Sequence, residues 1–252
     1  MPLVSIILPY YKKINFFRNT YNSIINQSYK NFELIIIYDD QDLKDYNKII
    51  EIIKKNQKLK IFLNEKNLGA GLSRNRGIKK AQGKYIAFID ADDLWSKDKL
   101  KKQILFMKKN NYKFTCSDYS KKFKKNIIID IKPKKKISYS NLMKNCQIGL
   151  STVVIEKDLV NYKLFPNFKT QEDLAAWLKT MRLKKISCYT LGKKLVIWNY
   201  NSNSLSSNSF QKIFDAYRVF RLLEKMSILK SLTYVLRLSI NSISRKIIFF
   251  NV

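Results

Sequence analysis

Three carboxylates stand within four residues of the sequence, in the segment Asp90-Ala91-Asp92-Asp93. They directly follow the apolar run 85–89, so they are expected at the end of a buried strand. Clustered carboxylates repel one another, and a cation should therefore share their site. Mg²⁺ or Mn²⁺ binds a few carboxylates, completes its shell with water and phosphate oxygens, and can neutralise a diphosphate leaving group. The cluster thus indicates a divalent-metal and diphosphate site. Capping of the following helix by Asp92 or Asp93 would explain one carboxylate but not the group.

Two further strand ends carry polar or aromatic side chains. Asp39-Asp40 follows the apolar run 32–38, and Pro9-Tyr10-Tyr11 follows the run 3–8. In parallel α/β sheets, ligands bind beyond the carboxyl ends of the strands. The Asp pair could accept hydrogen bonds from a base or ribose there, although Asp is also a common turn former.

The segment 67–77 combines glycines with Arg74 and Arg76 at the start of a helical pattern. Backbone N–H groups and guanidinium groups in such a place suit a phosphate. The alternative is a glycine-rich turn whose arginines point to solvent.

The sequence has no histidine. Acid or base chemistry near neutral pH must therefore fall to carboxylates, Lys, Tyr or Cys. Glu172 and Asp173 occupy the first turn of the helical pattern 171–182, where the helix dipole stabilises negative charge.

Apolar strand patterns alternate with amphipathic helical patterns along the first 110 residues. We expect strands at 3–8, 32–38, 59–63 and 85–89, and helices at 14–26, 43–55, 71–82 (stopped by Gly83) and 97–110. Later segments predict a lysine-rich loop or edge hairpin at 121–136, a strand at 151–155 and the helix 171–182. The alternation predicts an α/β fold: a Rossmann-like, mostly parallel sheet with helices on both faces.

The composition limits the kinds of partner that the protein could bind. Lys and Arg number 49 against 19 Asp and Glu, a formal charge of +30 that would attract nucleic acid, anionic lipid or phosphorylated substrates. A solvated lysine-rich surface and a membrane-surface role explain this charge about equally well, and nucleic acid is the weaker explanation. The three scattered cysteines argue against a zinc site or a disulfide framework. With no signal-peptide pattern and no apolar run of spanning length, we expect a cytoplasmic chain.

The composition shifts near Asn208. The segments 210–223 and 229–248 pair aliphatic and aromatic residues with Lys and Arg at helical spacing. We therefore divide the chain into a domain at 1–208 and a basic amphipathic helical region at 209–252. Such helices could lie at a membrane surface, pack on the first domain, or join two subunits into an oligomer.

Taken in order, these motifs resemble family 2 of the nucleotide-sugar glycosyltransferases, whose catalytic domain has the GT-A fold. The resemblance rests on Val4-Ser5-Ile6-Ile7-Leu8-Pro9-Tyr10-Tyr11, the segment 27–40 ending in Asp39-Asp40, the segment 67–77, Gly83 to Asp93, and the later Glu172-Asp173 motif. It covers the chain to about Tyr200. One departure is that Gln41-Asp42 stands where the family usually has Gly-Ser.

The resemblance implies an inverting transfer of sugar from a nucleotide-diphosphate donor. Pro9, Tyr11 and Asp40 would contact the nucleoside, Asp90 and Asp92 would form the metal and diphosphate site, and Asp173 would be the catalytic base, with Glu172 as its rival. Tyr10, Asp39, Arg74 and Ala91 complete the expected donor site. UDP-sugars are the family's commonest donors, and the departure at Gln41-Asp42 keeps dTDP and GDP donors open.

The acceptor expected for such an enzyme is a glycan or lipid-linked glycan of the bacterial cell surface, extended at the cytoplasmic face of the inner membrane. The alternatives are a sugar nucleotidyltransferase and a non-catalytic module that binds nucleic acid or membrane. A sugar nucleotidyltransferase would usually show a glycine-rich basic signature after its first strand, and this sequence lacks one. A non-catalytic binding module would not need the acidic cluster.

Overall fold

The computed structural model describes residues 1–53, 58–123, 127–200 and 208–250, with side chains described as far as residue 242. The helices are α1 (Ile14–Ile25), α2 (Lys44–Ile53), α3 (Ala70–Lys80), α4 (Lys99–Asn110), α5 (Tyr139–Lys144), α6 (Glu172–Lys184), α7 (Ser209–Arg218) and α8 (Ile228–Phe250). The strands are β1 (Val4–Tyr10), β2 (Phe32–Tyr38), β3 (Leu59–Leu63), β4 (Tyr85–Phe88), β5 (Leu94–Trp95), β6 (Phe114–Lys122), β7 (Ile128–Ile131), β8 (Lys136–Ile137), β9 (Val154–Glu156) and β10 (Cys188–Asn199).

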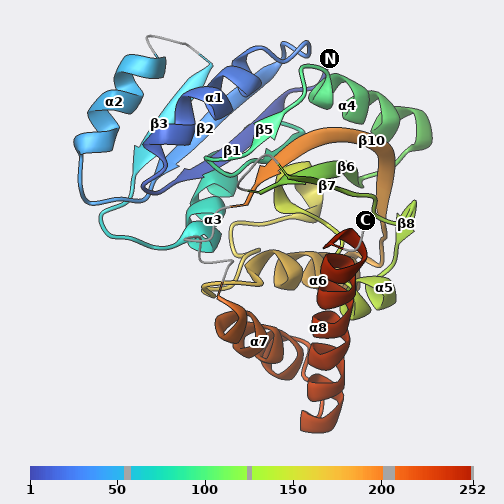
Figure 1. The fold of residues 1–252 in the computed structure, drawn as a ribbon. Coiled ribbons are helices and arrows are strands. Elements are labelled where there is room, and N and C mark those ends of the chain that lie inside the picture. Colours follow the sequence, from blue (N-terminus) through green and yellow to red (C-terminus); the bar gives the residue numbers. More distant parts are fainter. Residues whose placement is uncertain (54–57, 124–126, 201–207, 251–252) are drawn as a thin grey trace.

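One sheet runs through the molecule in the order β3-β2-β1-β4-β9-β6-β10-β5 (Figure 1). The first four strands in this order are parallel to one another, in registers that place Ile7 beside both Ile35 and Phe88. β9 is antiparallel to both β4 and β6, and β10 runs parallel to β6. The carboxyl ends of β1, β2, β4, β6 and β10 therefore lie at the same edge of the sheet.

Helices cover both faces of the sheet, which is why β1 and β2 are buried at every position. Side chains alternate between two apolar cores. Ile6 and Leu8 pack with residues of α1, α2 and α4, whereas Ile7 packs with residues of α3 and α6. The close approach of α3 needs Gly77, because a Cβ there would lie 2.5 Å from Ile7 Cγ2. The expected α/β fold with helices on both faces is confirmed.

The C-terminal helices α7 and α8 lie on the far side of α5 and α6 from the parallel strands (Figure 1). Between them, residues 219–223 form a π-helical turn. Ala216, Phe220 and Val235 are buried in the same core as Trp177 of α6. In the described residues, no helix combines the length and the apolar character needed to cross a bilayer.

Two local predictions need correction. Gly83 does not stop a helix: α3 ends at Lys80, and Gly83 lies against β1, where a Cβ would be 2.7 Å from the Leu3 carbonyl oxygen. The expected strand 151–155 begins later, because residues 150–152 form a 3₁₀ turn before β9.

The long strand β10 was not predicted. Gly192, with φ +71°, and two lysines interrupt its apolar pattern, and the pairing with β6 shifts register at this point. Part of the lysine-rich segment does form the expected edge hairpin, since β7 pairs antiparallel with β6.

Candidate functional site

The candidate site lies at the edge of the sheet where β1, β2 and β4 end. Their register brings Pro9, Asp39 and the acidic segment after β4 to neighbouring positions, although they are far apart in sequence. α6 begins with Glu172 and Asp173, and Glu172 is joined to Asp90 through ion pairs of both carboxylates with Arg74.

Arg74 on α3 joins two of the carboxylates. Its Nη2 lies 2.6 Å from Asp90 Oδ1, and its Nη1 lies 2.8 Å from Glu172 Oε1. The guanidinium is only 3% exposed. Burial alone would lower its pKa, but the charges of Asp90 and Glu172 outweigh burial and raise the pKa. Arg74 is therefore a buried bridge between the end of β4 and the start of α6. The side chain of Arg74 therefore does not point to solvent, and its contact with a phosphate stays a prediction.

Asp92 forms an ion pair with Lys13, just before α1, with 2.7 Å between Oδ2 and Nζ. Burial raises the pKa of Asp92, Lys13 lowers it, and the neighbouring charge of Asp90 raises it again. Asp90 and Asp92 thus share one electrostatic site. The sequence analysis did not single out Lys13, since no local pattern distinguishes it among so many lysines.

The third carboxylate of the cluster, Asp93, has a structural position. It is 3% exposed and accepts hydrogen bonds from Ser151 Oγ and from the backbone N–H of Asn199. Burial, followed by the charges of Asp90 and Asp92, raises its pKa well above the ordinary value. Asn199 also donates its side-chain amide to the Asp92 carbonyl oxygen. Neither Asp92 nor Asp93 caps a helix, because α4 begins at Lys99. Asn199 and Ser151 therefore fix the acidic loop, and both were missed because they lie on segments distant in sequence.

Glu172 and Asp173 differ in their surroundings. Glu172 is held by Arg74, whereas Asp173 accepts a hydrogen bond from the N–H of Leu174 (2.7 Å) and forms no ion pair among the described contacts. Burial, and then the adjacent charge of Glu172, raise the pKa of Asp173 to about 7. The charges of Arg74 and Asp90 also act on this carboxyl, so Asp173 lies within the same site.

The two carboxylates after β2 also have different positions. Asp39 is 2% exposed and accepts hydrogen bonds from Asn64 Nδ2 and from the backbone N–H groups of Leu68 and Gly69, at 2.6 to 2.8 Å. Its carboxylate therefore holds the turn that leads into α3. Asp40 accepts one long hydrogen bond, from Asp42 N at 3.3 Å.

The two tyrosines at the end of β1 differ in exposure: Tyr10 is buried and Tyr11 is exposed. Tyr10 is fully buried, stacks on Tyr38, and donates its hydroxyl to Asp45 Oδ2. Tyr11 is 45% exposed. Tyr10 was expected in the donor site; its ring is buried in the core, so a contact with a nucleotide would have to come from its backbone. The Ala91 side chain is likewise buried, and its carbonyl oxygen accepts a hydrogen bond from Thr20. Pro9 lies within β1, beside Ile37.

In the described parts of the chain, no group of three or more His, Cys, Asp or Glu side chains is arranged to hold a metal. Mg²⁺, however, usually binds through one or two carboxylates together with waters and substrate phosphates. Asp90 and Asp92 supply such a pair, and each already contacts a cationic side chain. The donor set therefore fits a divalent metal that is completed by a diphosphate.

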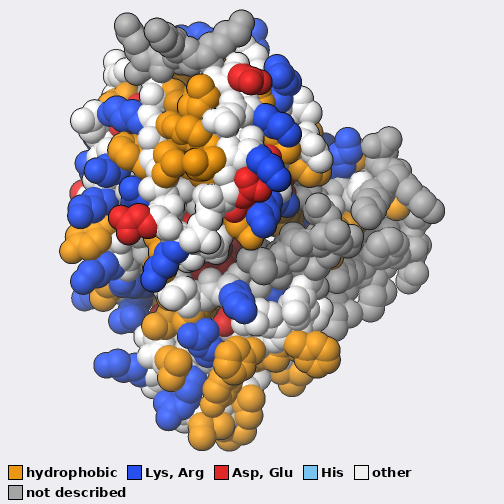
Figure 2. Space-filling view, turned by 90° about the vertical axis from the view of Figure 1, so that its left-hand side faces the viewer, with side chains coloured by type: hydrophobic (Ala, Val, Ile, Leu, Met, Phe, Trp, Pro, Cys, Tyr) orange, Lys and Arg blue, Asp and Glu red, His pale blue; other side chains and the backbone are white. Residues whose placement is uncertain are grey.

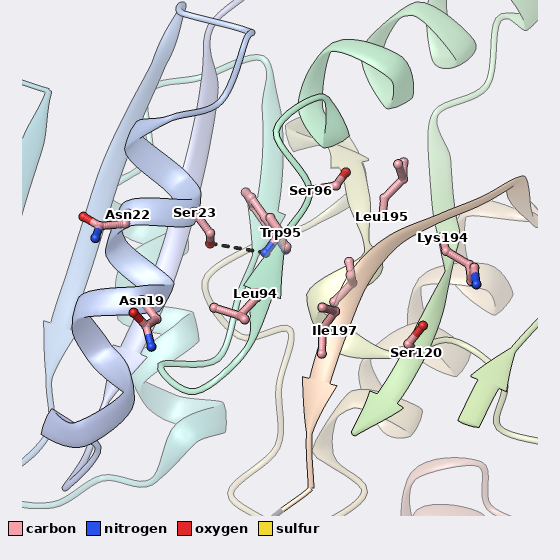
Figure 3. Close-up of a pocket in the computed structure, with 11 residues that line it drawn as sticks. Asn19, Asn22, Ser23, Leu94, Trp95, Ser96, Ser120, Lys194, Leu195 and Ile197 are labelled. Carbon is pink, nitrogen blue, oxygen red and sulfur yellow. Dashed lines mark hydrogen bonds between the residues drawn. The ribbon is translucent and has the colours of Figure 1, made fainter. Parts of the chain in front are cut away.

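A separate open groove lies between α1, β5 and β10 (Figure 3). Asn19, Trp95, Lys194 and Ile197 are among its lining residues, and Ser23 Oγ accepts a hydrogen bond from the Trp95 backbone there. None of the candidate site residues lines this groove.

Comparisons with known proteins agree with this geometry. The model of the glycosyl transferase family 2 matches residues 5–155. TuaG of Bacillus subtilis, a glycosyltransferase assigned to teichuronic acid biosynthesis, is 30% identical over 98% of both chains. WfgD of Escherichia coli, a UDP-Glc:α-D-GlcNAc-diphosphoundecaprenol β-1,3-glucosyltransferase, is 35% identical over 84% of this chain and 82% of its own.

Solved structures share the fold. The TarS fragment 1–349 of S. aureus in complex with UDP-GlcNAc matches 92% of this chain and 70% of its own, with a TM-score of 0.72 at 20% identity. The mannosyltransferase PcManGT of Pyrobaculum calidifontis, solved with GDP-Man and Mn²⁺, matches 93% and 70% with a TM-score of 0.69 at 13% identity. The family match sets aside the nucleotidyltransferase and the non-catalytic module, and the chain is a glycosyltransferase that belongs to glycosyl transferase family 2.

Proposed function

We propose that this glycosyltransferase transfers a sugar, with inversion at the anomeric carbon, from a UDP-sugar to a lipid-linked glycan acceptor of the bacterial cell surface. The observation that carries the proposal is the bridge through Arg74. It ties Glu172 to Asp90, whereas Asp173, with its pKa of about 7, forms no ion pair among the described contacts and feels the charge of Asp90.

The donor would lie across the ends of β1, β2 and β4. Tyr11 is exposed for stacking on a base, and Asp40 keeps acceptor capacity for a base or ribose, while Pro9 shapes the floor between them. The diphosphate would lie at Asp90 and Asp92, where Lys13 adds positive charge. Mn²⁺ or Mg²⁺ held by these two carboxylates would neutralise the charge of the departing diphosphate.

Asp173 would act as the general base. Its ionised carboxylate removes the proton of the acceptor hydroxyl while that oxygen forms a bond to the anomeric carbon. The bond from the anomeric carbon to the diphosphate oxygen breaks at the same time, on the opposite side of the sugar. The nucleoside diphosphate leaves with the bonding electrons, and Asp173 holds the proton. A carboxyl with a pKa near 7 suits this step, because a substantial fraction of it is ionised near neutral pH and it is basic enough to accept a proton.

The remaining residues of the expected donor site would hold the donor-contacting residues in position. Asp39 fixes the turn before α3, and Tyr10 packs beneath the end of β1. Arg74 orients Glu172 and Asp90. In this assignment residues 1–208 carry the donor site and the base, and residues 209–252 form the region that meets the acceptor's surroundings.

A lipid-linked acceptor is supported by the relatives, because WfgD is named for a diphosphoundecaprenol-linked substrate. Such an acceptor is anchored in a bilayer by its lipid and presents its sugar at the surface. The proposal therefore includes work at the cytoplasmic face of the inner membrane, with the enzyme peripherally bound.

Calorimetric titration with UDP, in the presence and absence of Mn²⁺, tests the donor site. Wild type is expected to bind UDP more tightly with Mn²⁺, and Asp92→Asn should abolish the metal-dependent gain. Asp158→Asn is the matched control, since Asp158 is 61% exposed and distant in the fold from the acidic loop. If UDP fails, dTDP and GDP are titrated next. Absence of binding by all three nucleotides would refute the proposal.

A further inference from the structure

Large apolar side chains gather on the outer surface of α7, α8 and the turn between them. Phe210 is 87% exposed, Leu229 is 77% exposed, and Phe214, Leu222, Leu232 and Leu236 are each more than half exposed. We call these six residues the C-terminal apolar face. Figure 2 shows apolar side chains collected at this lower end of the molecule, beside Lys and Arg. Soluble monomers rarely expose so many neighbouring large apolar side chains, so a partner is expected to cover them.

The face is separate from the core-facing side of the same helices. On α8, Ser231, Val235 and Leu238 are buried against the protein. Leu229, Leu232 and Leu236 recur at spacings of three and four, so they lie together on the opposite side. The inner side of α8 already stabilises the fold, and packing on the rest of the chain therefore does not account for the outer side.

The charge around this face has a single sign. The acidic residues within 208–242 are Asp215 and Glu224, whose carboxylates are buried and paired with Arg218 and Arg182. The exposed ionic side chains of this stretch, as far as the structure describes side chains, are Arg221, Lys225, Lys230 and Arg237. An apolar face bordered by cations matches an anionic lipid surface. A second copy of a chain with formal charge +30 would instead bring like charges together.

α7 is also attached to the segment that carries the proposed base. Asp215 Oδ2 accepts hydrogen bonds from both the backbone N–H and the hydroxyl of Thr170, each at 3.0 Å. Thr170 lies two residues before Glu172, where α6 begins. If α7 binds to an external surface, the start of α6 would therefore also lie at a fixed distance from that surface.

We infer that the C-terminal apolar face lies in the interface of an anionic phospholipid bilayer and keeps the Asp173 end of α6 close to the membrane. The part of this inference that places Asp173 near the membrane rests on the proposed function, because a lipid-linked acceptor presents its sugar at the membrane surface. Apolar side chains enter the headgroup boundary, and the cations contact the anionic headgroups.

Flotation with two kinds of vesicle tests the inference: phosphatidylcholine alone, and phosphatidylcholine with roughly 30% phosphatidylglycerol. The wild-type chain is expected to float with the anionic vesicles and to be released by high salt. The variant Leu229→Ser/Leu232→Ser/Leu236→Ser should lose flotation. The variant Lys225→Gln/Lys230→Gln/Arg237→Gln should bind on the order of 100-fold more weakly at low salt, because each of the three lost charges contributes about 1 kcal/mol and about 1.4 kcal/mol corresponds to a tenfold change.

A matched control variant removes an exposed leucine and neighbouring lysines from α4, away from the C-terminal apolar face. Leu105 on α4 is 57% exposed and is flanked by exposed lysines. The variant Leu105→Ser/Lys101→Gln/Lys108→Gln/Lys109→Gln should float like wild type. Equal loss in this control would show attraction by overall charge, and failure of wild type to float would exclude the bilayer; either result overturns the inference. A wild-type dimer that the leucine variant converts to monomer, without flotation, would assign the face to self-association and also overturn it.

UDP titration of the same variants separates this inference from the proposed function. Retained UDP binding with lost flotation supports the membrane face and leaves the donor site intact. Failure of the wild type to bind UDP, dTDP and GDP would refute the donor site, whatever the flotation result. The charge variant, in which each substituted residue is exposed, keeps the flotation test valid if the leucine variant unfolds.

Discussion

Glu172 lies 2.8 Å from the Arg74 guanidinium, whereas the adjacent Asp173 forms no ion pair among the described contacts. Two neighbouring carboxylates on one helical turn thus have different surroundings. The family resemblance left both as candidates for the base, and the geometry supports Asp173 in that role with Glu172 as a positioning residue.

Substitution of each carboxylate distinguishes the two roles. Asp173→Asn should lower kcat by about 10²- to 10⁴-fold, the usual contribution of a general base, and leave UDP affinity unchanged. Glu172→Gln should lower the unfolding free energy and disturb donor binding, since Arg74 would lose a partner while buried. Turnover with an active UDP-sugar, UDP calorimetry and urea unfolding measure these effects. A larger loss of kcat in Glu172→Gln than in Asp173→Asn would reverse the assignment.

The pH dependence should report the same carboxyl. The pKa of Asp173 is raised from 3.8 to about 7, so kcat/KM should rise with pH through a midpoint near 7 and level off at higher pH. Glu172→Gln should move this midpoint downward, because it removes a negative neighbour and leaves more of the Arg74 charge to act on Asp173. A raised carboxyl pKa also means that the folded state holds its proton more tightly, so this stabilising contribution is lost as pH rises from about 4 to 7. A midpoint that stays unchanged in Glu172→Gln would contradict the coupling between the two groups.

Asp39 and Asp40 form a matched pair for separating stability from binding. Asp39→Asn should cost about 2–3 kcal/mol of unfolding free energy, because buried donors of Asn64, Leu68 and Gly69 lose a charged acceptor. Asp40→Asn should change stability little and weaken UDP binding. Urea unfolding and calorimetry on both variants decide this, and equal destabilisation by the two would show that Asp40 is also a structural residue.

Lys99 offers a stability test away from the candidate site. Its side chain is fully buried, its ammonium has no hydrogen-bond partner among the described residues, and it lies 4.0 Å from the Trp95 ring centroid. Burial lowers its pKa from 10.5 to about 7. Between these values the unfolded chain binds a proton that the folded chain does not, so the contribution of Lys99 to stability should increase as pH rises from about 7.

Lys99→Met should therefore stabilise the protein near pH 7, and this gain should shrink by pH 9. Urea unfolding at the two pH values measures the change. Lys102→Met, at a 42% exposed position of the same helix, is the control and should be close to neutral at both. A gain in Lys99→Met that does not depend on pH would indicate a packing effect in place of titration.

The N-terminal half of the fold could be predicted because its signals are local. Strands buried on both faces appear as continuous apolar runs, and β2 and β3 begin and end where those runs do. The second half depends on pairing between distant segments. β5 and β8 have two residues each and no periodic pattern of their own.

The site residues divide in the same way. Asp90 and Asp92 could be found because they follow a recognisable strand. The partners that fix them, Arg74, Lys13 and Asn199, come from three other segments, and their geometry depends on the folded sheet. Arg74 was recognised as a charge near the site, but its burial between two carboxylates could not be inferred from spacing.

The hydrogen bonds between Asp215 and Thr170, and the shared core of Ala216, Phe220 and Trp177, have a consequence for protein engineering. Residues on both sides of the expected boundary near residue 208 are buried in one hydrophobic core. A chain shortened to residues 1–208 would expose the inner surface of α6 and release the loop before Asp173. Exchange of membrane-facing helices between related enzymes should therefore succeed only when Thr170 and the apolar residues beneath α7 are exchanged with them.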